Sequence, residues 1–142
     1  MYKVKMDGQT LYYPGDKEAV LTNPTLNLQT GYAGTFEFSV PPNNPLYDKI
    51  KNRSSMVSVF RDTTELFYGE VRKQPKVDRY RNKNVYCAGA MSFLADSIQP
   101  QAEYHDMTPR QMLETFLDIH NNQVEDRKKI YLGKVTITDA ND

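Results

Sequence analysis

The residues best suited to chemistry are one cysteine and two histidines. A thiol hydrolase needs a cysteine thiolate beside a histidine base, and the chain offers only Cys87, His105 and His120 for such a pair. Cys87 lies in the strand-like run of residues 85–88, where a free cysteine usually serves as a small buried hydrophobic side chain. The sequence therefore favours a structural cysteine. A cysteine hydrolase stays an open interpretation, and its mark would be thiol labelling of Cys87 that abolishes an activity.

Metal, nucleotide and serine-nucleophile sites lack their usual sequence marks. Glu103, Asp106 and Asp118 add possible metal ligands to the two histidines, but none of them stands at the spacing of a zinc-binding helix. His120 is expected instead near the C-terminal end of a helix, where the macrodipole favours a positive charge. The patterns GxGxxG, GxxxxGKS/T and GxSxG do not occur in the sequence. We therefore predict no enzymatic activity, no catalytic or metal-binding residues and no cofactor.

Charge is distributed unevenly along a chain whose formal net charge is zero. Residues 49–83 contain ten lysines and arginines against four acidic residues, whereas residues 103–126 contain six acidic residues and a single arginine. Segments of opposite sign suit self-association or docking of one segment on the other, and ordinary solvated faces give the same pattern. The predicted interface residues of the basic segment are Arg72, Lys73, Arg79 and Arg81.

The same basic segment suits a single-stranded nucleic-acid-binding β-barrel, which is the alternative function. Tyr80 and Tyr86 lie among or beside the lysines and arginines of residues 72–83, and such a mixture supplies phosphate contacts and stacking rings. The neutral net charge and the acidic segment argue against this interpretation. A further interpretation is a solvated hairpin edge, where lysine and arginine prevent edge-to-edge pairing of sheets.

Length and hydropathy point to a soluble protein of about one domain. A chain of 142 residues buries roughly two thirds of the surface that it exposes when unfolded. No apolar run approaches the ~20 residues of a membrane-spanning helix, and the charged opening MYKVKMDG is unlike a signal peptide. One cysteine cannot form an intramolecular disulfide. We expect no membrane span and a reducing compartment.

Alternating apolar residues and turn dipeptides predict a mainly antiparallel β structure up to about residue 90. Asp7-Gly8 marks the turn of an opening hairpin, residues 35–40 alternate most clearly, and Asn23-Pro24 is expected to separate two short strands. The predicted strands are residues 2–6, 10–13, 19–21, 25–28, 35–40, 56–60, 66–71, 77–80 and 85–88. Many short strands with turn chemistry between them indicate a small antiparallel barrel or sandwich.

Residues 41–52 are expected to leave the sheet and cross to the next strand. Pro41 and Pro42 remove two backbone donors, so the hydrogen-bonded ladder cannot continue through them. Residues 44–50 are expected to form one helical turn whose apolar side chains attach the crossover to the core. The predicted interface residues of this crossover are Pro41, Pro42, Leu46 and Tyr47.

Helical periodicity replaces alternation after residue 90. A short helix is expected over residues 92–97, and a longer helix over residues 109–121. Thr108 and Gln111 form a capping box in front of the longer helix, with a proline at its first position. The apolar stripe that this helix is expected to bury consists of Met112, Leu113, Phe116, Leu117 and Val124.

The end of the sequence is expected to return to β structure. Apolar and β-branched residues predict a final strand or hairpin arm over residues 128–138. We therefore expect an α+β protein, mainly β with α, in which residues 1–98 form the barrel domain. Residues 99–142 are expected to add a helix and a strand that pack on the barrel or start a second domain.

Four stretches of the sequence form a recognisable series. They are residues 35–50 (TFEFSVPPNNPLYDKI), 67–71 (FYGEV), 87–100 (with SFLADS) and 104–109 (YHDMTP). In this order they resemble the N-terminal part of tail-associated proteins from phages and prophages of Gram-positive bacteria. Such proteins are often labelled prophage endopeptidase tail or minor structural proteins. They are similar in turn to the central hub protein of contractile-phage baseplates.

The resemblance implies a structural role in a virion. It implies a tail-tube-like β-barrel hub domain that is made in the bacterial host cytoplasm and assembles as a trimer in the tail tip. The implied partners are further copies of the chain, the distal tail protein, the tape-measure protein, and DNA that passes through the lumen without sequence-specific binding. Some members carry a peptidoglycan-cleaving domain further along the chain. This sequence shows no residues for hydrolase chemistry, so we do not extend lysin activity to it.

Overall fold

The computed structural model describes residues 1–138 and shows a mainly β protein with additional helices. The chain divides into two compact units, Met1–Ala90 and Met91–Asp142. The predicted division between residues 98 and 99 thus lies inside the second unit. The predicted class, mainly β with α, is confirmed.

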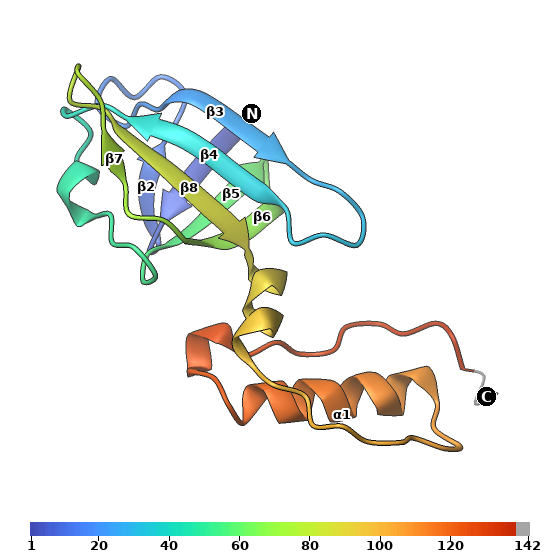
Figure 1. The fold of residues 1–142 in the computed structure, drawn as a ribbon. Helices are drawn as coiled ribbons and strands as arrows, with labels where there is room; N and C mark the ends of the chain where they lie inside the picture. The colour runs from blue at the N-terminus through green and yellow to red at the C-terminus, as the bar shows by residue number, and fades with distance from the viewer. Residues whose placement is uncertain (139–142) are drawn as a thin grey trace. The chain divides into compact units, whose positions relative to one another are not determined.

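The first unit is one antiparallel sheet that curls into half of a barrel (Figure 1). Its strands are β1 (Tyr2–Met6), β2 (Gln9–Tyr12), β3 (Thr22–Asn27), β4 (Thr35–Val40), β5 (Met56–Arg61), β6 (Thr64–Val71), β7 (Lys76–Val77) and β8 (Lys83–Gly89). Neighbouring strands follow the order β2-β1-β5-β6-β8-β4-β3, and the short β7 pairs with β8. The path begins with β2 and ends with β3, so these two strands are the edges of the curled sheet.

Tight turns join the hairpins where the sequence predicts them. β1 and β2 meet at Asp7-Gly8, where Met6 pairs with Gln9 and the two turn residues have positive φ angles of 49° and 80°. Positive φ at both positions gives the turn twist that matches a hairpin, and Asp-Gly adopts it readily. The predicted hairpin of β5 and β6 is also confirmed, with its turn at Asp62.

Two facing glycines allow β6 to turn the corner of the half-barrel. β6 pairs with β5 along its length but with β8 only through its last residues, where Gly69 lies opposite Gly89. A Cβ atom on Gly69 would lie 2.3 Å from the Ala88 carbonyl oxygen and 2.6 Å from the Phe67 ring. A Cβ atom on Gly89 would lie 1.7 Å from the Ala33 carbonyl oxygen. The chain segments approach this closely only because neither residue carries a side chain.

The concave face of the sheet holds the apolar core. The alternation predicted for β4 is confirmed, because Phe36, Phe38 and Val40 are buried while Glu37 is exposed. The Phe36 ring centroid lies 4.8 Å from that of Phe38 and 6.1 Å from that of Phe67. β1, β5, β6 and β8 contribute further buried residues to the same cluster. The first unit is therefore stabilised mainly by removal of apolar surface from water.

β3 runs through Pro24, where the sequence predicted a break between two short strands. Its pairing with β4 is irregular between Thr22 and Thr25. An edge strand tolerates a proline because the missing N–H does not interrupt a central ladder. The prediction of a separate strand over residues 19–21 was wrong. Ala19 and Leu21 are buried there, but as parts of a loop rather than a ladder.

A buried asparagine holds the crossover that follows β4. The Nδ2 atom of Asn44 donates to the carbonyl oxygens of Leu11, at 2.9 Å, and Val20, at 3.0 Å. Its Oδ1 atom accepts from the backbone N–H of Leu46 at 3.0 Å. One side chain thus fastens the crossover to β2 and to the loop before β3.

The helical turn predicted over residues 44–50 is shorter than expected. Only Tyr47–Lys49 is helical, as a 3₁₀ turn, because the backbone before it is engaged by the Asn44 side chain. Leu46 is buried in the core, and Tyr47 and Ile50 pack against it. The predicted attachment of the crossover through its apolar side chains is therefore confirmed.

The second unit contains the best-marked helix of the sequence. α1 (Pro109–Asn121) begins and ends as predicted. Thr108 Oγ1 accepts from the Gln111 N–H at 3.3 Å, and Gln111 Oε1 accepts from the Thr108 N–H at 2.9 Å, which confirms the capping box. The short helix predicted over residues 92–97 is a 3₁₀ helix, Ala90–Asp96. Within residues 1–138, no helix combines the length and the hydropathy needed to span a bilayer.

Two other predictions for the second unit were wrong. After the 3₁₀ turn Asp126–Lys128, residues 129–138 form no strand, since no strand among residues 1–138 pairs with them. The predicted stripe of α1 is half-buried at most positions and exposed at Leu113. His120 is the residue of α1 that is buried.

Candidate interaction surfaces

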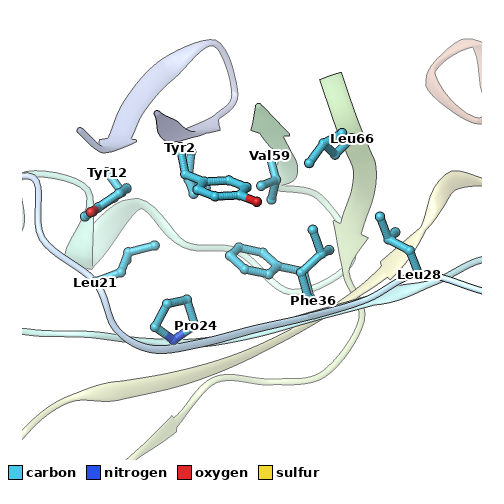
Figure 2. Close-up of a pocket in the computed structure, with 10 residues that line it drawn as sticks. Tyr2, Tyr12, Leu21, Pro24, Leu28, Phe36, Val59 and Leu66 are labelled. Carbon is cyan, nitrogen blue, oxygen red and sulfur yellow. The ribbon is translucent and has the colours of Figure 1, made fainter. Parts of the chain in front are cut away.

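An apolar cavity of about 600 Å³ opens on the concave face of the half-barrel. Phe36 and Val59 contribute buried side chains to its lining, whereas Tyr2 and Leu28 are 52% and 53% exposed. Figure 2 shows Tyr2 and Phe36 facing each other across the space. Six strands contribute to the lining, through Tyr2, Tyr12, Leu26, Phe36, Val59 and Leu66. Its volume and apolar lining are those of a typical binding site.

The two edges of the half-barrel differ in how open they are. On β2, the Leu11 carbonyl already accepts a hydrogen bond from Asn44. β3 is exposed along nearly its whole length, and no described strand lies beyond it in the sheet. Because an edge strand presents unpaired backbone groups, β3 is the place where a further strand can join this sheet.

The predicted interface residues of the crossover differ in exposure. Leu46 is buried, Pro41 and Tyr47 are half-buried, and Pro42 is exposed. The Tyr47 hydroxyl donates to the carbonyl oxygen of Arg81, so the crossover is joined to the β7–β8 turn. The structure thus brings two of the predicted interface segments together at one corner of the first unit. Leu46 points into the core and offers a partner little surface.

Lys83 fastens this corner, a role that sequence reasoning missed. Its Nζ atom donates to the Tyr47 carbonyl oxygen at 2.7 Å and lies 3.2 Å from Asp48 Oδ1. The same atom lies 3.9 Å from the centroid of the Tyr47 ring. These contacts combine a hydrogen bond, an ion pair and a cation–π interaction on one ammonium group. Lys83 therefore stabilises the packing of the crossover against β8, whereas its sequence context indicates only its positive charge.

Three of the four predicted basic interface residues have partners close to them, and the fourth, Arg81, is exposed. Arg72 Nε lies 3.0 Å from Oε2 of the buried Glu70. Lys73 Nζ lies 4.2 Å from the centroid of the Tyr86 ring. The guanidinium of Arg79 lies 4.6 Å from the ring centroid of the tyrosine that follows it. Each of these three positive groups thus interacts with an aromatic ring or a carboxylate. They do not form a uniform basic patch.

A shallow polar groove of about 380 Å³ lies on the outer face of β3, β4 and β8. Lys73, Lys76 and Tyr86 line it together with Glu37. Glu37 and Tyr86 are direct partners across β4 and β8. Here the structure joins lysines with an aromatic ring, as the nucleic-acid alternative requires, and adds a carboxylate that this alternative does not favour.

Cys87 lies in β8 and is buried, which confirms the prediction that it is a small core side chain. Burial raises the pKa of its thiol well above the usual range, because the thiolate is poorly solvated there. Residues 1–90 contain no histidine. The thiol is therefore held in its neutral form inside the half-barrel.

The histidines and carboxylates that the sequence offers as possible metal ligands do not form a group. His105 Nε2 lies 3.7 Å from Glu103 Oε2, and both side chains are largely exposed. Throughout the described residues, no three histidine, cysteine, aspartate or glutamate side chains are grouped as metal ligands. Asp106 is exposed in the loop before α1, and Asp118 is exposed on α1.

His120 is buried at the end of α1 and uses both ring nitrogens. Its Nδ1 atom lies 2.8 Å from Ser97 Oγ, and its Nε2 atom lies 3.0 Å from the Lys128 carbonyl oxygen. Because a carbonyl only accepts, Nε2 carries a hydrogen. The predicted position near the helix end is confirmed. The ring is buried, however, and it connects α1 with Ser97 and Lys128. No local sequence signal distinguishes a buried ring from an exposed one.

Two side-chain amides extend the network around His120. Asn121 Nδ2 donates to the Ile130 carbonyl at 2.8 Å, and its Oδ1 accepts from the Ile130 N–H at 2.9 Å. Gln123 binds the carbonyl and N–H of Ile98 in the same way, at 2.9 and 3.0 Å. Each amide thus satisfies both backbone groups of one residue, as a neighbouring strand would. Polar side chains therefore hold the loops around the end of α1.

No family model and no curated protein matches this sequence. The resemblance to tail-associated proteins therefore depends on the four stretches of sequence alone and stays a prediction. The same holds for the predicted interface residues and for the partners that the resemblance implies.

Proposed function

We propose that this chain is a structural module of a phage or prophage tail tip, which forms part of the end of the tail tube and docks to the distal tail protein. The observation that supports this proposal best is the open half-barrel, whose exposed edge strand β3 lies beside an apolar cavity. A neighbouring molecule stabilises such a surface, because it pairs the edge and removes apolar surface from water. The resemblance supplies the kind of assembly.

In the proposed assembly, copies of the chain form a ring in the virion tail tip, expected to be a trimer. The tape-measure protein and DNA pass through the ring, and the DNA is not bound sequence-specifically. This role depends on a rigid shape and on contacts between copies. It does not depend on a reactive centre, so the proposal includes no enzymatic activity.

Opposite charges are proposed to help the copies meet. Arg79 and Arg81 are exposed at the β7–β8 turn, and Glu114 and Asp118 are exposed on α1. If these groups approach across copies, reversing both arginines to glutamate should weaken ring formation at low salt, and added salt should reduce the difference. The double variant Lys17→Glu and Lys51→Glu makes the same charge change elsewhere and serves as control. Unchanged assembly of the arginine variant at low salt counts against this contact.

The decisive test of the proposed function measures the mass of the purified chain, alone and mixed with the distal tail protein of the same phage. Light scattering gives the mass, and electron microscopy shows the shape. We expect a ring-shaped complex that contains several copies of the chain. A chain that does not associate with the distal tail protein at tens of micromolar contradicts the proposal.

A single-stranded nucleic-acid-binding barrel is the second candidate. The outer groove supports it, since Lys73 and Lys76 lie there beside Tyr86. The position of Lys73 over the Tyr86 ring argues against it, because a base could stack only after the lysine moves away. Salt-sensitive retention of oligonucleotides that is lost in Tyr86→Ala and kept in Tyr68→Ala would favour this candidate. No retention at micromolar protein would contradict it.

A further inference from the structure

We propose that residues 131–138 of one copy add as a strand to the exposed edge β3 of a neighbouring copy and cover the apolar cavity there. This inference rests on the assembly role proposed above and names the contact that joins the copies. It connects two features of the chain that are otherwise unexplained. One is a segment with strand character that lies outside the sheet, and the other is an open edge beside an apolar cavity.

The donor segment has an apolar face at strand spacing. Alternate residues of an extended chain share a face. One face carries Tyr131, Gly133, Val135 and Ile137, and the other carries Leu132, Lys134, Thr136 and Thr138. Tyr131 and Ile137 are 78% and 65% exposed. Because β-branched and aromatic residues favour strands that pack on one side, the segment is suited to pairing over an apolar surface.

The donor segment starts at a fixed point. The Asn121 side chain binds both backbone groups of Ile130, so the chain is held up to that residue. From Tyr131 to Thr138 the chain belongs to no helix or strand. A strand that leaves a fixed point loses less conformational freedom on pairing than a free tail of the same length.

The acceptor is the second half of β3. Pro24 and the irregular pairing between Thr22 and Thr25 make the first half unsuitable for a regular ladder. From Thr25 onward β3 pairs regularly with β4, and its residue Leu26 lines the cavity. Leu28 follows at the rim, where it is 53% exposed. A strand added here places alternate side chains above the cavity, which is how an edge strand recognises a peptide.

The area involved favours a second copy in a closed assembly. An extended donor of eight residues is about 27 Å long, whereas the regular part of β3 consists of Thr25, Leu26 and Asn27, so the ladder itself is short and the rest of the segment extends over the cavity. The exposed parts of Tyr131, Ile137, Leu28 and Tyr2, with the paired backbone, amount to several hundred Å² per copy, below the about 800 Å² per partner of a standard interface. One contact is therefore weak. In a ring, every copy donates one strand and receives one, so each copy gains two contacts.

The test uses disulfide cross-linking between two variants of the full chain. One variant carries Asn27→Cys in β3, and the other carries Lys134→Cys or Thr136→Cys in the donor segment. Asn27 alternates with the cavity-lining Leu26 and Leu28, so its side chain lies on the side of the sheet away from the cavity, as those of Lys134 and Thr136 do in the added strand. The native Cys87 is buried and does not compete. Each chain has one engineered thiol, so a disulfide between donor and acceptor variants must join different copies. We expect this heterodimer to exceed, at least tenfold, the one formed when Thr63→Cys in the β5–β6 turn replaces Asn27→Cys.

Other products of the same experiment would overturn the inference. Equal yields with Asn27→Cys and Thr63→Cys would mean that β3 is not the acceptor. A predominance of donor–donor dimers would mean that two segments pair with each other. In a chain carrying both Asn27→Cys and Thr136→Cys, a disulfide within the monomer would mean that the segment pairs with its own copy.

Proline substitution supplies an independent measurement. Thr136→Pro or Val135→Pro removes a backbone donor from the segment, and we expect loss of concentration-dependent self-association in sedimentation, with unchanged circular dichroism. Lys17→Pro in an exposed loop serves as control. Self-association that both proline variants retain overturns the inference. If the proline variants keep their self-association and still form rings with the distal tail protein, the proposed function stands without this contact. If the wild-type chain forms no rings with the distal tail protein, the result counts against the proposed function itself.

Discussion

The two units of this chain are stabilised by different interactions. Met1–Ala90 closes around a cluster of buried aliphatic and aromatic side chains, and strand ladders satisfy its backbone groups. In the second unit, the apolar side of α1 is half-exposed, and the loops around its end are held by His120, Asn121 and Gln123. The first unit thus depends on packing and the second on the geometry of a few hydrogen bonds.

This difference has an energetic consequence. Burying one large apolar side chain contributes about 1.5–3 kcal/mol, whereas one hydrogen bond contributes about 0.5–1.5 kcal/mol net. The first unit has many buried apolar side chains, and the described part of the second has few. We therefore expect the second unit to open at a lower free energy than the first.

The largest effect on stability is expected at Gly69 and Gly89, where β6 turns from β5 toward β8. Gly89→Ala and Gly69→Ala each place a Cβ atom much closer to a backbone carbonyl oxygen than van der Waals contact allows, so each should lower the free energy of unfolding by about 3 kcal/mol or more. Urea denaturation followed by circular dichroism measures this loss. Gly133→Ala is the control, because an added Cβ there meets no atom within 4 Å. A loss below about 1 kcal/mol at both corner positions would show that the strands can separate at no great cost.

The second unit should respond most to His120→Ala. The substitution leaves the Lys128 carbonyl and the Ser97 hydroxyl without this partner, which should cost about 2–3 kcal/mol. Hydrogen exchange should show faster exchange at the amides of α1 and unchanged rates in β4 and β8. His105→Ala removes an exposed histidine from the same unit and should change neither. An equal increase of amide exchange in both units would contradict the expectation that the second unit opens independently of the first.

The buried thiol of Cys87 should make the stability of the first unit depend on pH. Its pKa is raised in the folded state, so the folded thiol stays neutral while the unfolded thiol ionises above its ordinary pKa of about 8.5. The stabilisation is therefore fully present below about pH 8.5 and is lost as the pH rises, by at most about 1.4 kcal/mol per pH unit. Denaturation of wild type and Cys87→Ala between neutral and alkaline pH measures the difference. Parallel pH profiles of the two proteins would contradict it.

The smallest effect is expected at the capping box of α1. Thr108→Ala removes the acceptor of the Gln111 N–H and should cost about 1 kcal/mol. Thr115→Ala is the matched control, since the Thr115 hydroxyl bonds to a carbonyl inside the helix and its loss should be nearly neutral. Hydrogen exchange in the first turn of α1 measures both changes. Similar exchange in the two variants would show that tertiary contacts, not the cap, start the helix.

Local patterns predicted the parts of this fold that are determined locally. Asp7-Gly8 specified a hairpin because few residues adopt two successive positive φ angles. The alternation of residues 35–40 specified a half-buried strand, and Thr108 with Gln111 specified the start of α1. In each case the residues that decide the structure lie within a few positions of one another.

The features that the sequence did not reveal depend on distant contacts. The burial of His120 depends on Ser97 and on the Lys128 carbonyl, which no periodicity connects. Asn44 fastens the crossover by reaching Leu11, which lies in another strand. Residues 128–138 have strand character, but no strand among residues 1–138 pairs with them, because a strand propensity does not by itself provide a neighbouring strand.

Asn44 also has a consequence for how this protein avoids aggregation. Its side chain occupies the Leu11 carbonyl on β2, whereas β3 is exposed at the opposite margin of the sheet. Fibril growth by stacking requires every molecule to accept a partner on both margins. One carbonyl on the β2 margin is thus occupied from within the molecule, which disfavours the stacking of folded half-barrels through both margins.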